Sequence, residues 1–67
     1  MRIEFTTNEY MKAHGREPRG KGTWWFDIEG NEFCAYGTLT EAKAACRREA
    51  RRIAEDPDQA LRIKIMP

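Results

Sequence analysis

Four short stretches of the chain alternate hydrophobic and polar residues. This period of two predicts β-strands, because successive side chains of a strand point to opposite faces of a sheet. The first stretch places Met1, Ile3 and Phe5 on one face, with polar residues between them. The predicted strands cover residues 1–5, 23–29, 32–37 and 61–66. The last strand turns Leu61, Ile63 and Ile65 inward, and Arg62, Lys64 and Met66 outward.

The two central strands are predicted to form a hairpin. Gly30 and Asn31 between them suit a two-residue turn of type II′. That turn would place Trp25 opposite Tyr36, and Trp24 opposite Gly37. One face would then carry Trp24, Phe26, Ile28, Phe33 and Ala35, and the other Trp25, Asp27, Cys34 and Tyr36.

After residue 37 the apolar positions recur every three or four residues, which predicts a long helix over residues 38–56. Thr38 and Glu41 have the spacing of a capping box, although Thr40 is an equally good N-cap. Pro57 is expected to end this helix. Its apolar stripe is Leu39, Ala42, Cys46, Ala50 and Ile53, mostly small side chains that let a helix lie close to a sheet.

A second, short helix is predicted over residues 9–14, and it ends at Gly15. Residues 15–22 follow as a flexible, basic loop rich in glycine. The resulting order, β-α-β-β-α-β in one domain, predicts an α+β fold with an antiparallel sheet of three to four strands and one long helix packed on it. A ferredoxin-like fold has this order and places both helices on one face. The alternative is a ββαβ core with the short helix and the loop over the other face.

The adjacent tryptophans are predicted to lie on opposite faces. Trp24 belongs to the core set, because a chain of this size needs its aromatic area inside. Trp25 and Tyr36 would form an exposed aromatic pair close to Arg62 and Lys64, and such a pair suits a partner-binding surface. The alternative is that Tyr10, Met11 and His14 of the short helix cover the pair.

The net charge of +1 hides a segregation of charge along the chain. Residues 23–42 carry four carboxylates and no Lys or Arg, whereas the segments on either side are basic. A basic surface that contacts protein or nucleic acid is therefore predicted, with a merely solvated face as the alternative. Its residues would be Arg16, Arg19 and Lys21 in the loop, and Lys43, Arg47, Arg48, Arg51 and Arg52 in the long helix.

Motifs that would indicate catalysis are incomplete. Residues 15–21 match the start of a phosphate-binding P-loop, but Gly22 replaces the metal-binding Ser or Thr, and a strand rather than a helix follows. Cys34 and Cys46 are expected to be free thiols on opposite sides of the sheet, and with one histidine they cannot form a zinc site. No enzyme activity, cofactor or metal is expected. With no long apolar run or signal-like start, we expect a cytoplasmic protein without membrane contact.

Residues 10–26 resemble a pattern of short proteins from bacteriophages and mobile elements, a group that includes anti-CRISPR proteins. The resemblance implies binding to a host defence complex. Residues 22–49 are similar to the arm-type DNA-binding domain of tyrosine integrases, whose sheet enters the major groove. Asp27, Glu29 and Glu32 depart from that basic sheet and argue against DNA contact through the hairpin.

Together these features predict a non-enzymatic protein that binds stoichiometrically to a host protein or protein–nucleic acid complex, as a monomer or weak homodimer. Trp25, Tyr36, Arg62 and Lys64 are its expected contact residues. The alternative is direct nucleic-acid binding by the basic loop and the helix arginines. Salt dependence separates the two, because phosphate contacts weaken steeply as salt is added.

Overall fold

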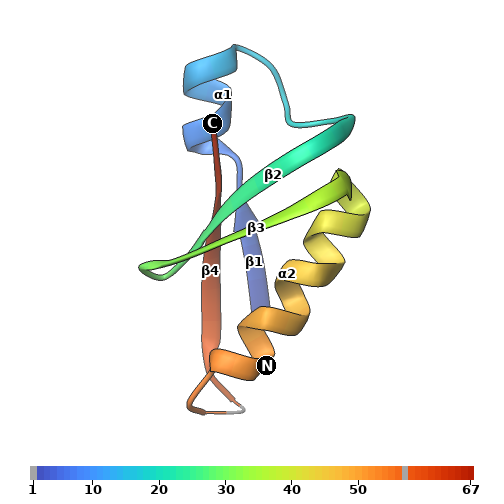
Figure 1. The fold of residues 1–67 in the computed structure, drawn as a ribbon. Helices are drawn as coiled ribbons and strands as arrows, with labels where there is room; N and C mark the ends of the chain where they lie inside the picture. The colour runs from blue at the N-terminus through green and yellow to red at the C-terminus, as the bar shows by residue number, and fades with distance from the viewer. Residues whose placement is uncertain (1, 57) are drawn as a thin grey trace.

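The computed structural model describes residues 2–56 and 58–67. Its elements are β1 (Arg2–Thr6), α1 (Asn8–His14), β2 (Lys21–Ile28), β3 (Asn31–Thr38), α2 (Leu39–Ile53) and β4 (Ala60–Met66) (Figure 1). The α+β class and the predicted β-α-β-β-α-β order are confirmed. The expected inward position of Met1 lies outside the described residues.

The sheet has the strand order β1-β4-β2-β3. β2 is antiparallel to both β3 and β4, as predicted, but β1 is parallel to β4, so the sheet is mixed. The ferredoxin-like arrangement, which is antiparallel throughout, is therefore wrong. The reason lies in the first connection. β1 and β2 run in opposite directions, so α1 and its loop stay at one end of the sheet, whereas α2 carries the chain back from β3 to the parallel strand β4 (Figure 1).

The β2–β3 hairpin forms with a different turn from the one predicted. Glu29 and Gly30 occupy the turn, with φ of 47° and 96°, and two positive φ values are typical of type I′. The Gly30 amide donates to Asp27 Oδ1 at 2.7 Å, and this bond holds the turn in place. The register therefore moves by two residues: Trp25 lies opposite Cys34, and Trp24 opposite Ala35. A shift of two leaves every side chain on its predicted face.

The core lies between α2 and one face of the sheet. α2 buries Ala42, Cys46 and Ala50, with Leu39 and Ile53 packed at the margin, which confirms the predicted stripe. The sheet contributes Trp24, Phe26, Ile28, Leu61, Ile63 and Ile65. α1 adds Tyr10, whose ring centroid lies 5.8 Å from that of Trp24. The ββαβ alternative, with the short helix over the other face, is therefore wrong.

The beginning of α2 is a capping box. The Glu41 amide donates to Thr38 Oγ1 at 3.2 Å, and the Thr38 amide donates to Glu41 Oε1 at 3.0 Å. Thr38 is therefore the N-cap. The helix ends at Ile53, three residues earlier than predicted, because Ala54 adopts an extended conformation with φ of −67° and ψ of 132°.

Candidate binding surface

The outward side chains of the sheet form rows across the strands, on the face opposite the core. The middle row contains Met66, Trp25 and Cys34, and the next row contains Thr23 and Tyr36. Trp25 is 49% exposed and Tyr36 is 72% exposed, and they are two of the three large hydrophobic residues exposed in the described part of the chain. We call Trp25, Tyr36, Cys34 and Met66 the aromatic patch.

The two tryptophans have separate environments because the strand alternates. Trp24 is only 6% exposed, and its Nε1 donates to the backbone oxygen of Gly37 at 3.2 Å. Its burial confirms the core prediction. The idea that Tyr10, Met11 and His14 cover Trp25 is wrong, because Tyr10 packs on the core side against Trp24 and stacks on His14, with ring centroids 4.2 Å apart.

Within the patch, Trp25 and Tyr36 are diagonal neighbours rather than the directly opposed pair that was predicted. The two-residue change of register places Tyr36 opposite Thr23, one row from Trp25. Diagonal neighbours on one face remain within reach of large aromatic side chains. The Lys21 ammonium lies 6.0 Å from the centroid of the Tyr36 ring, so a cation borders the patch at this end.

The two cations predicted beside the pair are separated by the observed register. Lys64 lies in the row next to Trp25, across from Asp27. Arg62 lies opposite Glu4 on β1 and points an Nη2 atom at Glu4 Oε2, 4.0 Å away. Because Trp25 pairs with Met66, four residues beyond Arg62, about 13 Å of strand separates them. The structure therefore brings Trp25, Tyr36 and Lys64 together and leaves Arg62 at the far end.

The cations of α2 lie on the core side of the sheet and not beside the patch. Lys43 Nζ and the Arg47 guanidinium carbon lie 5.3 and 5.1 Å from the centroid of Phe5, so both pack over a β1 ring. Arg48 and Arg51 are exposed on the helix. Arg16 and Arg19 are exposed in the loop that leads into Lys21. The predicted basic residues therefore form two groups, and only the loop group reaches the patch, through Lys21.

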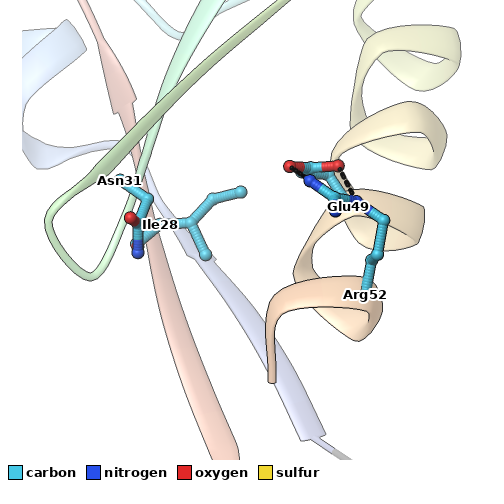
Figure 2. Close-up of polar contacts among 4 residues, drawn as sticks. All are labelled: Ile28, Asn31, Glu49 and Arg52. Atoms are coloured by element: carbon cyan, nitrogen blue, oxygen red, sulfur yellow. Dashed lines mark hydrogen bonds and ion pairs between the residues drawn. The ribbon is translucent and has the colours of Figure 1, made fainter. Parts of the chain in front are cut away.

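Arg52 is occupied by an ion pair. Its Nε donates to Glu49 Oε1 at 2.9 Å and its Nη2 to Glu49 Oε2 at 2.7 Å (Figure 2). These bonds lower the pKa of Glu49 and raise the pKa of Arg52. Asp56 lies beyond the end of α2, so the partner of Arg52 comes from the preceding turn of the helix.

A hollow of about 610 Å³ lies between this ion pair and the hairpin turn. Figure 2 shows Ile28 and Asn31 on one side and Glu49 and Arg52 on the other. Its polar groups bond locally: Asn31 Nδ2 donates to the Ile28 carbonyl at 3.2 Å, and Arg52 holds Glu49. Asn31, Glu49 and Arg52 therefore each have a bonding partner within the lining of the hollow.

The two cysteines are free thiols on opposite sides of the sheet, as predicted. Cys34 is exposed within the aromatic patch. Cys46 is a residue of α2 that is buried against the sheet, and burial raises its pKa to about 11, although Arg47 opposes the shift. A thiol with so high a pKa is protonated at neutral pH and is a poor nucleophile. Among the described residues, no group of three or more His, Cys, Asp or Glu side chains is placed to hold a metal ion.

Sequence reasoning missed two neighbours of the aromatic pair. Met66 was predicted to face outward and Lys21 to be basic surface, but neither was placed beside Trp25 or Tyr36. The alternation in β4 contains the signal for Met66, yet only the β2–β4 register shows that it lies next to Trp25.

Neither helix in the described part of the chain has the length and apolar character needed to cross a membrane. Comparisons of the chain with protein-family models, with curated proteins and with solved structures give no match.

Proposed function

We propose that this chain is a non-enzymatic binding protein that docks on a partner protein through the aromatic patch. The observation that carries the proposal is the exposure of Trp25 and Tyr36, diagonal neighbours on adjacent strands of a sheet whose other face holds the core. Large aromatic side chains are costly to leave in water, and Trp and Tyr are enriched among the residues that dominate binding energy.

The surroundings of the patch suit a protein partner. Cys34 and Met66 extend its apolar centre, and charges of both signs surround it: Lys21 at one end, and Lys64, Asp27 and Glu32 in the row at the other. An apolar centre inside a polar rim is the usual anatomy of a protein interface. Strands also hold side chains in place, so little conformational entropy is lost when the partner docks.

Direct nucleic-acid binding is less well supported. Glu4, Asp27 and Glu32 lie on the same sheet face as the patch, whereas the α2 cations lie on the opposite side. A phosphate backbone would therefore meet carboxylates as it crosses the sheet. The exposed loop arginines could still contact nucleic acid within a larger complex, so a host protein–nucleic acid complex stays among the proposed partners.

The surroundings of the thiol of Cys46, the imidazole of His14 and the polar side chains beside the hollow favour binding over catalysis. Cys46 is buried and protonated, and His14 is stacked on Tyr10. Beside the hollow, Asn31 bonds to the Ile28 carbonyl and Arg52 bonds to Glu49. None of these groups is set up as an activated nucleophile with a neighbouring base.

The test is a comparative affinity capture from nuclease-treated lysate of the source cell. The protein and its Trp25→Ala, Tyr36→Ala and Arg48→Ala variants serve as baits. Arg48 is the matched control, because it is exposed on the helix side of the molecule. We expect the same partner protein with the unchanged chain and with Arg48→Ala, and loss of that partner with both aromatic variants.

The captured partner is then purified and its affinity measured at increasing salt. Weak salt dependence and loss of binding in Trp25→Ala support the proposal. Capture that depends on Arg48 but not on Trp25 would overturn it. A ligand that is captured only when nuclease is left out of the lysate, with affinity falling steeply as salt rises, would also overturn it in favour of nucleic acid.

A further inference from the structure

The two edge strands of the sheet, β1 and β3, differ in how well they are protected against pairing with a strand of another molecule. β1 has five residues, of which Arg2 and Glu4 are charged. β3 has eight residues, and Glu32 is its only charged one; it contains neither Lys nor Pro. Soluble proteins commonly protect edge strands with lysine, proline, bulges or short length. β3 carries none of these devices.

The backbone of β3 is open along its outer side from Glu32 to Tyr36, whereas the Thr38 amide at the end of the strand already donates to Glu41 Oε1. In the described part of the chain, β3 has one neighbour in the sheet, β2. The pairing with β2 is unbroken from Asn31 to Thr38, without a bulge. Because ladder bonds alternate in an antiparallel pair, every second residue of β3 directs its N–H and C=O away from β2. An extended strand of another molecule can bond to these groups.

We propose that β3 pairs antiparallel with β3 of a second copy of the chain, so that the sheet continues across a two-fold axis. This inference goes beyond the proposed function and does not depend on it, since the pairing uses the edge of the sheet and not its face. Symmetric pairing of one patch with itself is the commonest way in which identical chains associate.

The charges at the two ends of β3 select this occupant and this direction. Glu32 and the turn residue Glu29 make the hairpin end acidic, whereas Lys21 lies opposite Thr38 at the other end. Thr38 lies six positions after Glu32, about 20 Å along the strand, so Glu32 and Lys21 of one chain do not meet. An antiparallel second copy brings the Glu32 end of each chain beside the Lys21 end of the other. A parallel copy would oppose glutamate to glutamate.

The pairing also extends the aromatic patch. Cys34 and Tyr36 are β3 residues on the open face, so the patches of the two copies would meet along the new contact. The dimer would present one continuous open face, with Trp25 and Tyr36 repeated across the axis. Both α2 helices would remain on the core side.

The first test is sedimentation velocity under reducing conditions, from micromolar to millimolar protein. Cys34→Lys places a charge in the middle of the β3 edge, where two copies would face each other. Thr23→Lys is the matched control, because it adds the same charge to an exposed position of the same face on the inner strand β2. Thermal unfolding followed by circular dichroism checks that both variants are folded.

We expect the unchanged chain and Thr23→Lys to shift towards dimer as concentration rises, and Cys34→Lys to stay monomeric. A monomer at every concentration for the unchanged chain would overturn the proposal. Equal loss of dimer in both lysine variants would overturn the edge contact as its basis.

A charge exchange tests the direction of pairing. Lys21→Glu or Glu32→Lys alone is expected to weaken self-association roughly tenfold, because each change reverses two symmetric exposed pairs. The double variant restores opposite charges across the axis and should recover the original dissociation constant. A double variant weaker than either single one would contradict the antiparallel arrangement.

Discussion

Trp24 and Trp25 are neighbours in β2, and the alternation of the strand turns them to opposite faces of the sheet. Trp24 packs in the core beside Tyr10, and its indole N–H donates to the Gly37 carbonyl. Trp25 keeps half of its surface in water, between Cys34 and Met66. One residue of separation therefore divides a stabilising side chain from one available for binding.

Replacement of each tryptophan should separate stability from binding. Trp24→Ala is expected to lower the free energy of unfolding by about 3–5 kcal/mol, because it leaves a cavity and removes buried aromatic surface. Trp25→Ala should cost about 1 kcal/mol or less, as an exposed position does. Urea unfolding followed by circular dichroism measures both. Equal losses would contradict the assignment of the two rings to core and surface.

The raised pKa of the Cys46 thiol predicts that the fold loses stability at alkaline pH. The pKa of Cys46 rises from its ordinary value of 9.0 to about 11 in the folded chain, so the folded state holds the proton more tightly than the unfolded state. Its contribution to stability is complete below pH 9 and is lost as the pH rises through 11. Urea unfolding between pH 8 and pH 11 should show this decline, and Cys46→Ala should flatten it. A decline of the same size in the variant would assign the effect to lysines or tyrosines instead.

At the scale of elements, the junction between β3 and α2 depends on a few residues. The capping box joins Thr38 and Glu41, and Gly37 precedes it with φ of 140°. A Cβ at Gly37 would lie 3.1 Å from Glu41 Oε1, within the space that the cap uses. The same glycine carbonyl accepts the Trp24 bond. The start of the helix and the packing of Trp24 are therefore linked through one residue.

Removal of the cap should destabilise the whole chain. Thr38→Ala is expected to lower the free energy of unfolding by about 1 kcal/mol, the usual effect of losing a threonine N-cap. Thermal unfolding measures the loss, and Thr40→Ala is the control, since Thr40 is the N-cap candidate that the structure does not use. A larger effect at Thr40 would show that the helix begins there in solution.

The cap also makes stability sensitive to acid. The backbone and side chain of Thr38 bond to Glu41 and lower its pKa. A lowered pKa stabilises the fold above the ordinary value of 4.5, and this contribution is lost as the pH falls below it. The stability of Glu41→Gln should therefore change less between pH 6 and pH 3 than that of the unchanged chain. An identical pH profile would argue against the bond.

The faces of the elements could be predicted from sequence, whereas their partners could not. A period of two assigns Trp24 and Trp25 to opposite faces whatever the register, and a period of 3.6 assigns Ala42, Cys46 and Ala50 to the core. The hairpin register depends on which two residues turn. Gly30 suits either the predicted or the observed turn, and the bond from its amide to Asp27 accompanies the observed one. Glu29 at positive φ gave no signal, because glutamate seldom adopts it.

At the scale of the whole molecule, some elements pack against their neighbours in the chain, and others pair with segments that are distant in the chain. β2, β3 and α2 follow one another and pack together, whereas β4 pairs with strands that are far away in the chain. Nothing in the alternation of residues 1–5 shows that β1 lies parallel beside β4. The register between β2 and β4 is also a contact between distant segments. The sequence therefore predicted both Lys64 and Arg62 near Trp25, and only the observed register shows that Arg62 lies at the far end.

This division predicts the order of folding. We expect the β2–β3–α2 segment to form in the transition state and β4 to dock afterwards, because local contacts cost less loop entropy. Ala44→Gly should then slow folding, and Ile63→Val should mainly speed unfolding. Stopped-flow kinetics in urea separates the two rates. Slower folding in Ile63→Val, to the same degree as in Ala44→Gly, would show that β4 docks early.

The parallel pairing of β1 with β4 has a consequence during synthesis on the ribosome. β1 is made before every other described element, and its one neighbour in the described sheet is made after all of them. Ile3 and Phe5 therefore leave the ribosome long before a strand exists to pair with them. Arg2 and Glu4 place charges on this unpaired segment, and charged residues disfavour pairing with other nascent chains until residues 60–66 have been synthesised.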